Sequence, residues 1–426
     1  MAAFASDVSV LALLVLLLSG AAQAAADEPV SFSAGFSSDM VLQRAPAKAA
    51  LYGFGTGPVS VHVAGTDGTA AAVEYTVVAQ PRADGAWKAF LAPHEAGGSY
   101  TIIASSGGSS ATLERVTMGD VYYCSGQSNM ALSTYYTFSA DTVRAEFAKE
   151  AGPYSALRLF QFGGMGFNTT LASYTPRYAT ASQSVATDPL HGSWYNASQA
   201  VSVVTEPSTN RADPSANKTA FDTFSATCLY FGVELIDALG ADAKIPIGLI
   251  QSAVGGSTIE AWMSNESRAE CTQRMVPKAG LGGGKGEFPF MQHQPGALFY
   301  GYVAPFVNMS ISGFLWYQGE NNCGMENVGN SAEGTGYGCE LQTMVQQWRA
   351  IWSASPGTTA PLAPFGIATL AAGGSEGNDG HMANMRWSQT ANYGSWDNPK
   401  MPNTFGAQLC LLRSMFAVHL VTKQCP

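Results

Sequence analysis

The pattern of apolar and polar positions divides the chain into two parts. From residue 27 to about residue 115, short alternating apolar runs such as "VSVHVAG" and "VEYTVVAQ" are broken by Gly, Pro and Asp. Alternation with a period of two residues, interrupted by turn residues, is typical of short β-strands. We therefore predict an accessory β domain of sandwich type over residues 27–115.

From Gly119 the pattern changes to buried apolar segments, each followed by a polar or Gly-rich loop and a helical stretch. "IPIGLIQSAVGGS" and "ISGFLWYQGE" indicate strands, whereas "FSATCLYFGVELIDAL" and "LQTMVQQWRAIW" indicate helices. This repetition predicts an α/β sheet with mostly parallel strands. Because ligands bind beyond the carboxyl ends of such strands, we expect the functional residues just after strand endings. Residues 165–220 and 270–292 are expected to form long loops.

The first strand ending with candidate chemistry is "SGQSN", in which Gly126 precedes Ser128 by two positions. A nucleophilic serine needs an exposed position on a tight turn, with backbone N–H groups nearby to stabilise an oxyanion. Serine is also a common turn residue that does nothing more than bind its own backbone. This segment alone fits both interpretations.

The second strand ending is "SAVGGSTIEAWM". Backbone N–H groups around Gly255 would face the strand end and could bind an oxyanion. Ser257 or Thr258 is expected to cap a helix that begins near Ile259, with Glu260 in its first turn. Any Gly-rich turn between a strand and a helix has the same form, so this motif needs support from others.

The third strand ending is "WYQGENN". An amide side chain such as that of Gln318 could donate a further hydrogen bond to an oxyanion, and Glu320 could organise the loop or orient a substrate hydroxyl. Asn321 lies in the same polar loop. The alternative is a loop whose asparagines cap its own backbone.

These segments resemble, in order and in spelling, the sialate O-acetylesterase family of SGNH-type hydrolases. The motifs that carry the resemblance are "MVLQRAP" at 40–46, "GDVYYCSGQSNM" at 119–130, "IPIGLIQSAVGGSTIEAWM" at 245–263, "WYQGENN" at 316–322 and "MRWSQTANYG" with "NPKMPNTF" at 385–405. The resemblance implies a flavodoxin-like three-layer esterase domain over residues 117–405. It also implies a secreted or lysosomal enzyme that removes acetyl groups from sialic acid hydroxyls without a metal or other cofactor.

Carried over by motif, Ser128 resembles the nucleophile, Gly255 the backbone oxyanion donor, and Gln318, Glu320 and Asn321 the polar loop of the family. The resemblance implies that Ser128 attacks the acetyl carbonyl and that the sugar hydroxyl leaves. Water then hydrolyses the acetyl-enzyme. An acetyl-xylan esterase or another carbohydrate esterase would use the same residues and remains an alternative.

The catalytic base is where this sequence departs from the family. The family pattern implies an Asp and a His-Pro segment downstream of "MPNTF", whereas residues 406–426 form a divergent tail. His381 is the best substitute, since it lies in a polar Gly-rich segment after a late strand and Asp379 could hold its second ring nitrogen. The alternative is that His381 is a surface residue and that this chain binds acetylated glycans without turnover. The other histidines are better interpreted as exposed or packed residues than as the catalytic base. They are His62, His94, His191, His293 and His419.

Composition narrows the classes of partner. Charged residues make up 12% of the chain, the net charge is −10, and no block of Lys or Arg stands out. This disfavours a nucleic-acid-binding surface, which needs clustered cations. The apolar run from Val8 to Leu18 and the small residues after it predict a signal peptide over residues 1–25, and no later segment is apolar enough to span a membrane.

The seven cysteines show no paired C-x-x-C spacing, so the sequence does not support a zinc cluster. In a secreted chain we expect disulfides, and the first candidate pair is Cys323 with Cys339, which flank a Gly-rich loop. Five N-x-S/T sequons, at Asn168, Asn196, Asn217, Asn265 and Asn308, fit secretion.

Overall fold

A computed structural model describes residues 29–68, 72–162, 192–206, 217–240, 244–271, 294–323, 334–371 and 381–408. The predicted signal peptide, most of the divergent tail, much of the two predicted long loops, and Asp379, His191, His293 and His419 lie outside the described residues.

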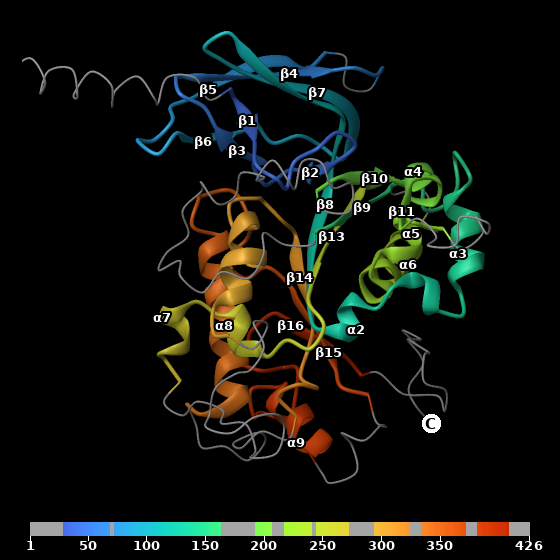
Figure 1. Cartoon of the computed structure of the whole chain (residues 1–426), viewed down its shortest axis with the longest axis vertical. Helices are drawn as coiled ribbons and strands as arrows, with labels where there is room; N and C mark the ends of the chain where they lie inside the picture. Colours follow the sequence, from blue (N-terminus) through green and yellow to red (C-terminus); the bar gives the residue numbers. More distant parts are fainter. Residues whose placement is uncertain are drawn as a thin grey trace, which may run out of the picture.

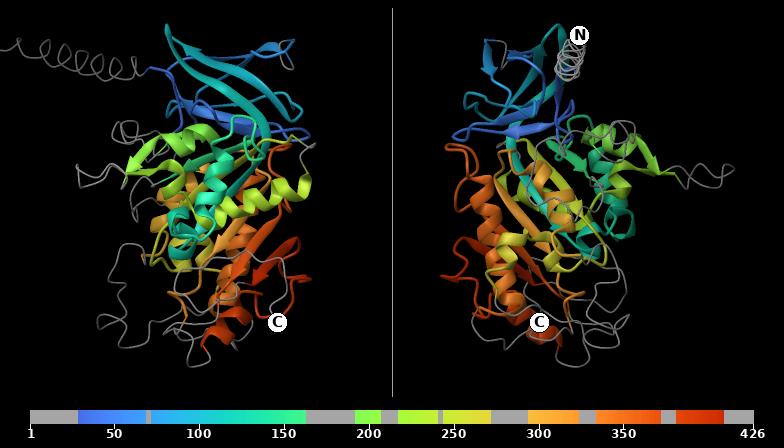
Figure 2. Two further views of the ribbon diagram at one scale, coloured as in Figure 1. Left: turned by 90° about the vertical axis from the view of Figure 1, so that its right-hand side faces the viewer. Right: turned by 60° about the vertical axis from the view of Figure 1, so that its left-hand side comes forward.

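The N-terminal strands form one end of the molecule (Figures 1 and 2). Three of them make a small antiparallel sheet: β1 (Ser31–Phe32), β3 (Ala50–Phe54) and β6 (Ala86–Phe90). Three others pair antiparallel at the edge of a larger sheet: β4 (Val59–Gly65), β5 (Glu74–Ala79) and β7 (Gly97–Ser106). Along β4 the buried residues are Val59, Val61 and Val63, which is the alternation that the sequence shows.

One long strand, β8 (Ser109–Gly126), connects the two parts of the molecule (Figure 1). Its first half pairs antiparallel with β7, and β2 (Val41–Gln43) pairs with its middle. Its second half lies between β13 (Ile247–Ala253) and β14 (Gly313–Tyr317) and is parallel to both. The domain boundary expected at residues 115–117 therefore falls inside a continuous strand.

The main path of the large sheet has the order β10, β9, β13, β8, β14, β15, β16. In this spatial order, each pair of neighbouring strands after β10 is parallel. The remaining bounds are β9 (Leu157–Gln161), β10 (Trp194–Asn196), β15 (Phe365–Thr369) and β16 (Thr404–Gln408). Only β10 joins this series antiparallel. The prediction of an α/β protein is confirmed, with a large mixed sheet and a small N-terminal antiparallel one.

Helices of different lengths and two short strands connect these strands. Their bounds are α2 (Ser128–Ala131), η1 (Thr134–Tyr136), α3 (Ala140–Phe147), α4 (Ala197–Ser202), β11 (Val204–Glu206), β12 (Lys218–Thr219), α5 (Ala220–Thr223), α6 (Ala226–Leu239), η4 (Ile259–Trp262), α7 (Asn265–Arg268), η6 (Phe299–Val303), η7 (Ala304–Phe306), α8 (Gly336–Trp352) and α9 (His381–Ser388). In the part of the chain that the structure describes, no helix has the length and apolar content to cross a bilayer.

The two longest of these helices cover opposite faces of the large sheet (Figure 1). Tyr122 and Tyr123 are neighbours on β8, so their side chains point to opposite faces. Tyr122 packs against Phe231 of α6, with ring centroids 4.9 Å apart. Tyr123 packs against Trp348 and Trp352 of α8, at 5.7 and 5.4 Å. Burial of these aromatic rings holds both helices on the sheet.

Two disulfides are present among the described cysteines, Cys124–Cys228 and Cys271–Cys339. The predicted pair of Cys323 with Cys339 is wrong. Cys339 lies in the first turn of α8, which packs against α7, and Cys271 follows α7 directly. Cys323 belongs to neither disulfide, and its Sγ lies 3.6 Å from Sδ of Met382. Proximity along a loop did not reveal which side of the helix Cys339 faces.

Candidate active site

The three polar segments expected from the sequence meet at one edge of the large sheet. In the parallel register, Gly126 at the end of β8 is level with Ala253 on β13 and with Tyr317 on β14. Because these strands are neighbours, the segments that follow them emerge side by side. The structure thus brings Ser128, Gly255 and the loop after Tyr317 into one region.

The turn before Ser128 depends on Gly126. Its φ is +143°, which side-chain-bearing residues rarely adopt, and a Cβ placed there would lie 2.1 Å from the backbone oxygen of Tyr317. The N–H of Gln127 donates to that same oxygen at 2.9 Å, and the N–H of Val254 donates to the oxygen of Gly126 at 3.0 Å. The chain can therefore turn sharply while remaining bound to both neighbouring strands.

Ser128 is the first residue of α2 and is exposed. Gly255 is also exposed, and a Cβ placed on it would lie 3.7 Å from Cβ of Ser128. The backbone of the segment after β13 therefore lies directly against the candidate nucleophile. A serine with open access and backbone N–H groups beside it is the arrangement that acyl transfer needs.

Two hydroxyl groups fasten α2 to the N-terminus of α6. Oγ of Ser225 donates to the backbone oxygen of Met130, and Oγ1 of Thr227 donates to the oxygen of Asn129 at 3.1 Å. Both residues come from the turn that begins α6, where Ser225 also caps the helix by accepting from the N–H of Cys228. The helix that carries Ser128 is held at the backbone oxygens of Asn129 and Met130.

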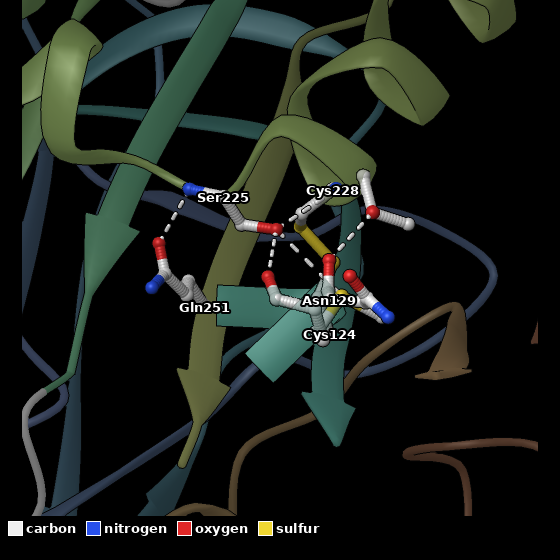
Figure 3. The surroundings of a disulfide bond; sticks show 7 residues. Cys124, Asn129, Ser225, Cys228 and Gln251 are labelled. Atoms are coloured by element: carbon white, nitrogen blue, oxygen red, sulfur yellow. Dashed lines mark hydrogen bonds between the residues drawn. A yellow bond between two sulfur atoms is a disulfide. The ribbon is translucent and has the colours of Figure 1, made fainter. Parts of the chain in front are cut away.

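The disulfide Cys124–Cys228 lies directly beside these contacts (Figure 3). It joins β8, two positions before Gly126, to the first turn of α6. On the neighbouring strand, Oε1 of Gln251 accepts from the N–H of Ser225 at 2.6 Å. Strand β8, strand β13 and helix α6 are thus connected covalently or by hydrogen bonds immediately behind the turn of Ser128.

The sequence neighbours of Ser128 bind the loop that follows β14. Oε1 of Gln127 accepts from the N–H groups of Gly319 and Asn321, both at 3.3 Å. Nδ2 of Asn129 donates to Oε1 of Glu320. Glu320 is therefore bound to the residue that follows the candidate nucleophile. Of the three residues 127–129, only Ser128 is exposed.

Gln318 and Asn321 connect this loop to the one that carries Gly255. Gln318 is fully buried, and its Nε2 donates to the oxygen of Ser257 at 3.0 Å and to Oδ1 of Asn322 at 2.6 Å. Nδ2 of Asn321 donates to the oxygen of Gly256. Because both hydrogens of the Gln318 amide have partners inside the protein, this pattern favours a role in holding the loops together over direct donation to an oxyanion.

Asn322 is a residue of this site that the sequence did not single out. Its Oδ1 accepts from the N–H of Ile259 at 3.0 Å, and its Nδ2 donates to Oε2 of Glu260 at 3.1 Å. The helix expected near Ile259 is present as the short η4, with Thr258 at its N-cap position and no side-chain capping bond. Glu260 is buried behind the loops. In the sequence, an acidic residue inside the apolar string "IEAWM" was the one sign that a polar partner such as Asn322 had to lie nearby.

Glu260 and Glu340 form a buried acidic pair behind these loops. Burial raises the pKa of the Glu260 carboxyl. Burial, and then the charge of Glu260, raise the pKa of Glu340 well above its usual range, while Arg268 acts in the opposite direction. These effects favour a neutral Glu340 carboxyl, because a second buried negative charge beside Glu260 would be costly.

Helix α9, which begins at His381, packs against the same loop. Nε2 of Gln389, the residue directly after α9, donates to the oxygen of Gln318 at 3.0 Å. A Cβ placed on Gly319 would lie 3.2 Å from Cγ of Met385. The backbone of His381 therefore begins a helix that touches the loop after β14, whereas the side chain of His381 and all of Asp379 lie outside what the structure describes.

His62 lies on β4 and His94 lies between β6 and β7, both in the N-terminal part of the chain. Nδ1 of His62 lies 3.2 Å from Oγ1 of Thr76, and Nε2 of His94 lies 2.8 Å from the hydroxyl of Tyr75. Both rings have partners within that part of the molecule, so neither is a candidate partner of Ser128.

Comparison with known proteins agrees with these observations. A family model described as carbohydrate esterase, sialic acid-specific acetylesterase, matches residues 164–355. The chain is similar to the sialate O-acetylesterase of Homo sapiens, with 30% identity over 412 residues that cover 92% of this chain and 68% of the relative. The Rattus norvegicus sialate O-acetylesterase is 28% identical over 450 residues, which cover 97% of this chain and 74% of the relative.

Among solved structures, a carbohydrate acetylesterase from Xanthomonas citri aligns with a TM-score of 0.60 and 23% sequence identity. The alignment covers 90% of this chain and 68% of that one. At this identity the likeness concerns the fold, and it extends over both the N-terminal strands and the large sheet.

Proposed function

Since the chain belongs to the sialate O-acetylesterase family of carbohydrate esterases, we propose that it removes acetyl groups from the hydroxyls of sialic acids. Its class as a carboxylic ester hydrolase acting on acetylated carbohydrate follows from the family. The particular sugar and the roles of individual residues are our proposal.

The observation that carries the proposal is the exposed Ser128 at the end of β8, with the backbone of Gly255 against it. In the reaction, Oγ of Ser128 attacks the acetyl carbonyl carbon, and the carbonyl oxygen becomes an oxyanion. The N–H of Gly255 would donate to that oxygen. The C–O bond to the sugar then breaks, the sugar hydroxyl leaves with a proton, and water hydrolyses the acetyl-enzyme.

We assign the base to His381, with Asp379 as its partner. The contacts of α9 with the loop after β14 support this assignment, because that loop also binds Gln127 and Asn129 on either side of Ser128. Glu320 would orient the loop and a substrate hydroxyl. An imidazole takes the proton from Ser128 in the first half-reaction and returns it to the sugar oxygen; in the second half-reaction it activates water.

The finer fold and localisation are also proposals. A parallel sheet with α6 and α8 on opposite faces supports the flavodoxin-like three-layer architecture of SGNH hydrolases. Two disulfides support a secreted or lysosomal protein, because such bonds persist in oxidising compartments.

The test is acetate release by the purified chain from a chromogenic acetyl ester, from O-acetylated sialic acid and from acetylated xylan. We expect turnover of the first two, with kcat lowered on the order of 10⁴-fold in Ser128→Ala and in His381→Ala. An active His381→Ala variant would refute the assigned base. Release from xylan but not from sialic acid would refute the substrate. A folded wild type as inactive as Ser128→Ala would mean that the chain binds acetylated glycan without hydrolysing it.

A further inference from the structure

Three large aromatic side chains are exposed within four residues, shortly after the candidate nucleophile. The exposed fractions are 51% for Tyr135, 49% for Tyr136 and 71% for Phe138. Leaving an aromatic ring in water forgoes about 25 cal/mol for each Å² that could be buried. A concentration of such rings on a folded surface therefore marks a place where something binds.

These rings stand on a rigid backbone. The N–H and Oγ1 of the buried Thr134 both donate to the backbone oxygen of Phe224, at 2.8 and 2.9 Å. The hydroxyl of Thr137 lies 2.6 Å from that of Tyr230 on α6. Because the segment is fixed to α5 and α6, the exposure of the rings is built into the fold and does not come from a loose loop.

A cation accompanies two of the rings. Nζ of Lys218 lies 4.7 Å from the ring centroid of Tyr135 and 5.2 Å from that of Tyr136. The two tyrosine rings meet edge to face, with centroids 5.2 Å apart. Together they present ring surface, phenolic hydroxyl groups and one positive charge on a protein whose net charge is −10.

The chain itself limits the distance of this surface from Ser128. Tyr135 lies seven positions after Ser128, and the first residues of this stretch form α2. With a rise of 1.5 Å per helical residue and at most 3.4 Å per extended residue, the two Cα atoms are no more than about 18 Å apart. The aromatic rings therefore lie within reach of an oligosaccharide whose acetylated residue is bound at Ser128.

We propose that Tyr135, Tyr136 and Phe138, together with Lys218, form a platform that binds the sugars beyond the acetylated residue of an acidic glycan. The inference rests on the proposed function, since it names the form in which the substrate is recognised. A sugar ring has an apolar C–H face that stacks on an aromatic ring while its hydroxyl groups remain in water. Lys218 supplies the charge that suits a carboxylate on the same glycan.

Binding is tested in the Ser128→Ala background, so that turnover does not interfere. Calorimetry compares an O-acetylated sialyl-oligosaccharide with free O-acetylated sialic acid. We expect the oligosaccharide to bind more tightly than the monosaccharide. Tyr135→Ala, Tyr136→Ala and Phe138→Ala should each lower the affinity for the oligosaccharide about two- to tenfold and leave the affinity for the monosaccharide unchanged. Lys218→Ala should lower the affinity for sialylated oligosaccharides more than the affinity for their neutral counterparts, whereas Lys218→Arg should bind both as the parent protein does.

The matched control is Leu362→Ala. Leu362 is 54% exposed and precedes β15, so it lies near the amino ends of the parallel strands, away from the edge that carries Ser128. The Leu362→Ala variant should bind the oligosaccharide and the monosaccharide with unchanged affinity. Equal affinity for oligosaccharide and monosaccharide, or full binding by the combined aromatic variant, would overturn the platform.

Activity separates this inference from the proposed function. With Ser128 restored, the aromatic variants should hydrolyse a chromogenic acetyl ester normally, while KM for the acetylated oligosaccharide rises. Parallel loss on both substrates would indicate damage to the fold and would overturn the platform. If the wild type hydrolyses the chromogenic ester but no acetylated sialic acid, the proposed substrate is wrong, whatever the aromatic variants show.

Discussion

The two disulfides form a matched pair for separating stability from catalysis. Cys124–Cys228 closes a stretch of 104 residues and joins the strand before Ser128 to the helix that holds α2. Cys271–Cys339 closes a stretch of 68 residues and joins the end of α7 to α8, on the other face of the large sheet. The perturbation is the replacement of each pair by alanine.

The stability change follows from the chain entropy of the unfolded state. The loop-closure relation gives about 4.7 kcal/mol of unfolding free energy for the bond that spans 104 residues and about 4.4 kcal/mol for the bond that spans 68. The two variants should therefore unfold at similar denaturant concentrations, both well below the wild type.

Their activities should differ. Without Cys124–Cys228, the turn of Ser128 keeps its hydrogen bonds to Ser225 and Thr227 but loses the covalent link behind them. A displacement of about 1 Å at a reacting group can lower the rate about 10²-fold, so we expect a fall in kcat of up to that size. The variant without Cys271–Cys339 should keep kcat close to that of the wild type.

The assay measures kcat on a chromogenic acetyl ester at low temperature, with the folded fraction of each variant determined by urea unfolding under the same conditions. Values are corrected for that fraction. If the folded Cys124→Ala/Cys228→Ala protein keeps its full kcat, or if both variants lose kcat equally, the disulfide does not position Ser128 and the reasoning is refuted.

Other expected outcomes follow from single contacts. Gly126→Ala would bring a Cβ to 2.1 Å from the oxygen of Tyr317, so the variant should lose activity and about 1–3 kcal/mol of unfolding free energy, measured by urea unfolding. Asn322→Ala should cost a similar amount and lower kcat more than it changes KM, because it releases Ile259 and Glu260 behind the Gly255 loop. Between pH 4.5 and the raised pKa of Glu340, the folded carboxyl keeps a proton that the unfolded one loses. The unfolding free energy should therefore fall as pH rises, by up to about 1.4 kcal/mol per pH unit, and Glu340→Gln should flatten this dependence in urea titrations.

The sequence predicted the strands and the two long helices well because their apolar positions repeat with the periods of two and 3.6 that burial on a sheet or along a helix face requires. It did not predict that β8 would continue from the antiparallel N-terminal strands into the parallel part of the large sheet. The burial pattern of β8 changes along its length, from alternating exposed positions before Arg115 to no exposed position from Val116 onward, where only Asp120 and Tyr122 are half-buried. A strand that changes from one-sided to two-sided burial looks like two elements in a one-dimensional pattern.

At the site, the residues predicted were those whose position follows from the end of a strand, such as Ser128 and Gly255. The residues missed were those whose role depends on the far side of a loop or helix. Asn322 looks like a solvent-facing loop asparagine until η4 is placed beside it, and Cys339 gives no sign of facing α7 rather than Cys323. Such contacts depend on rotation about an element's axis, which the spacing of residues along the chain does not determine.

The contacts around Ser128 explain why a string as short as "SGQSN" is specific. Gly126 is required by the close approach of Tyr317, Gln127 binds two N–H groups of the next loop, and Asn129 binds Glu320 while its backbone oxygen accepts from Thr227. Ser125 lies within β8 between β13 and β14, so every position but Ser128 is committed to a neighbouring strand, loop or helix. The proposed nucleophile Ser128 is therefore held in place, and changes to its neighbours should act on kcat. Because such a site treats any acetyl ester alike, selection among acetylated sugars requires groups farther along the substrate, which is the role argued for the aromatic rings that begin at Tyr135.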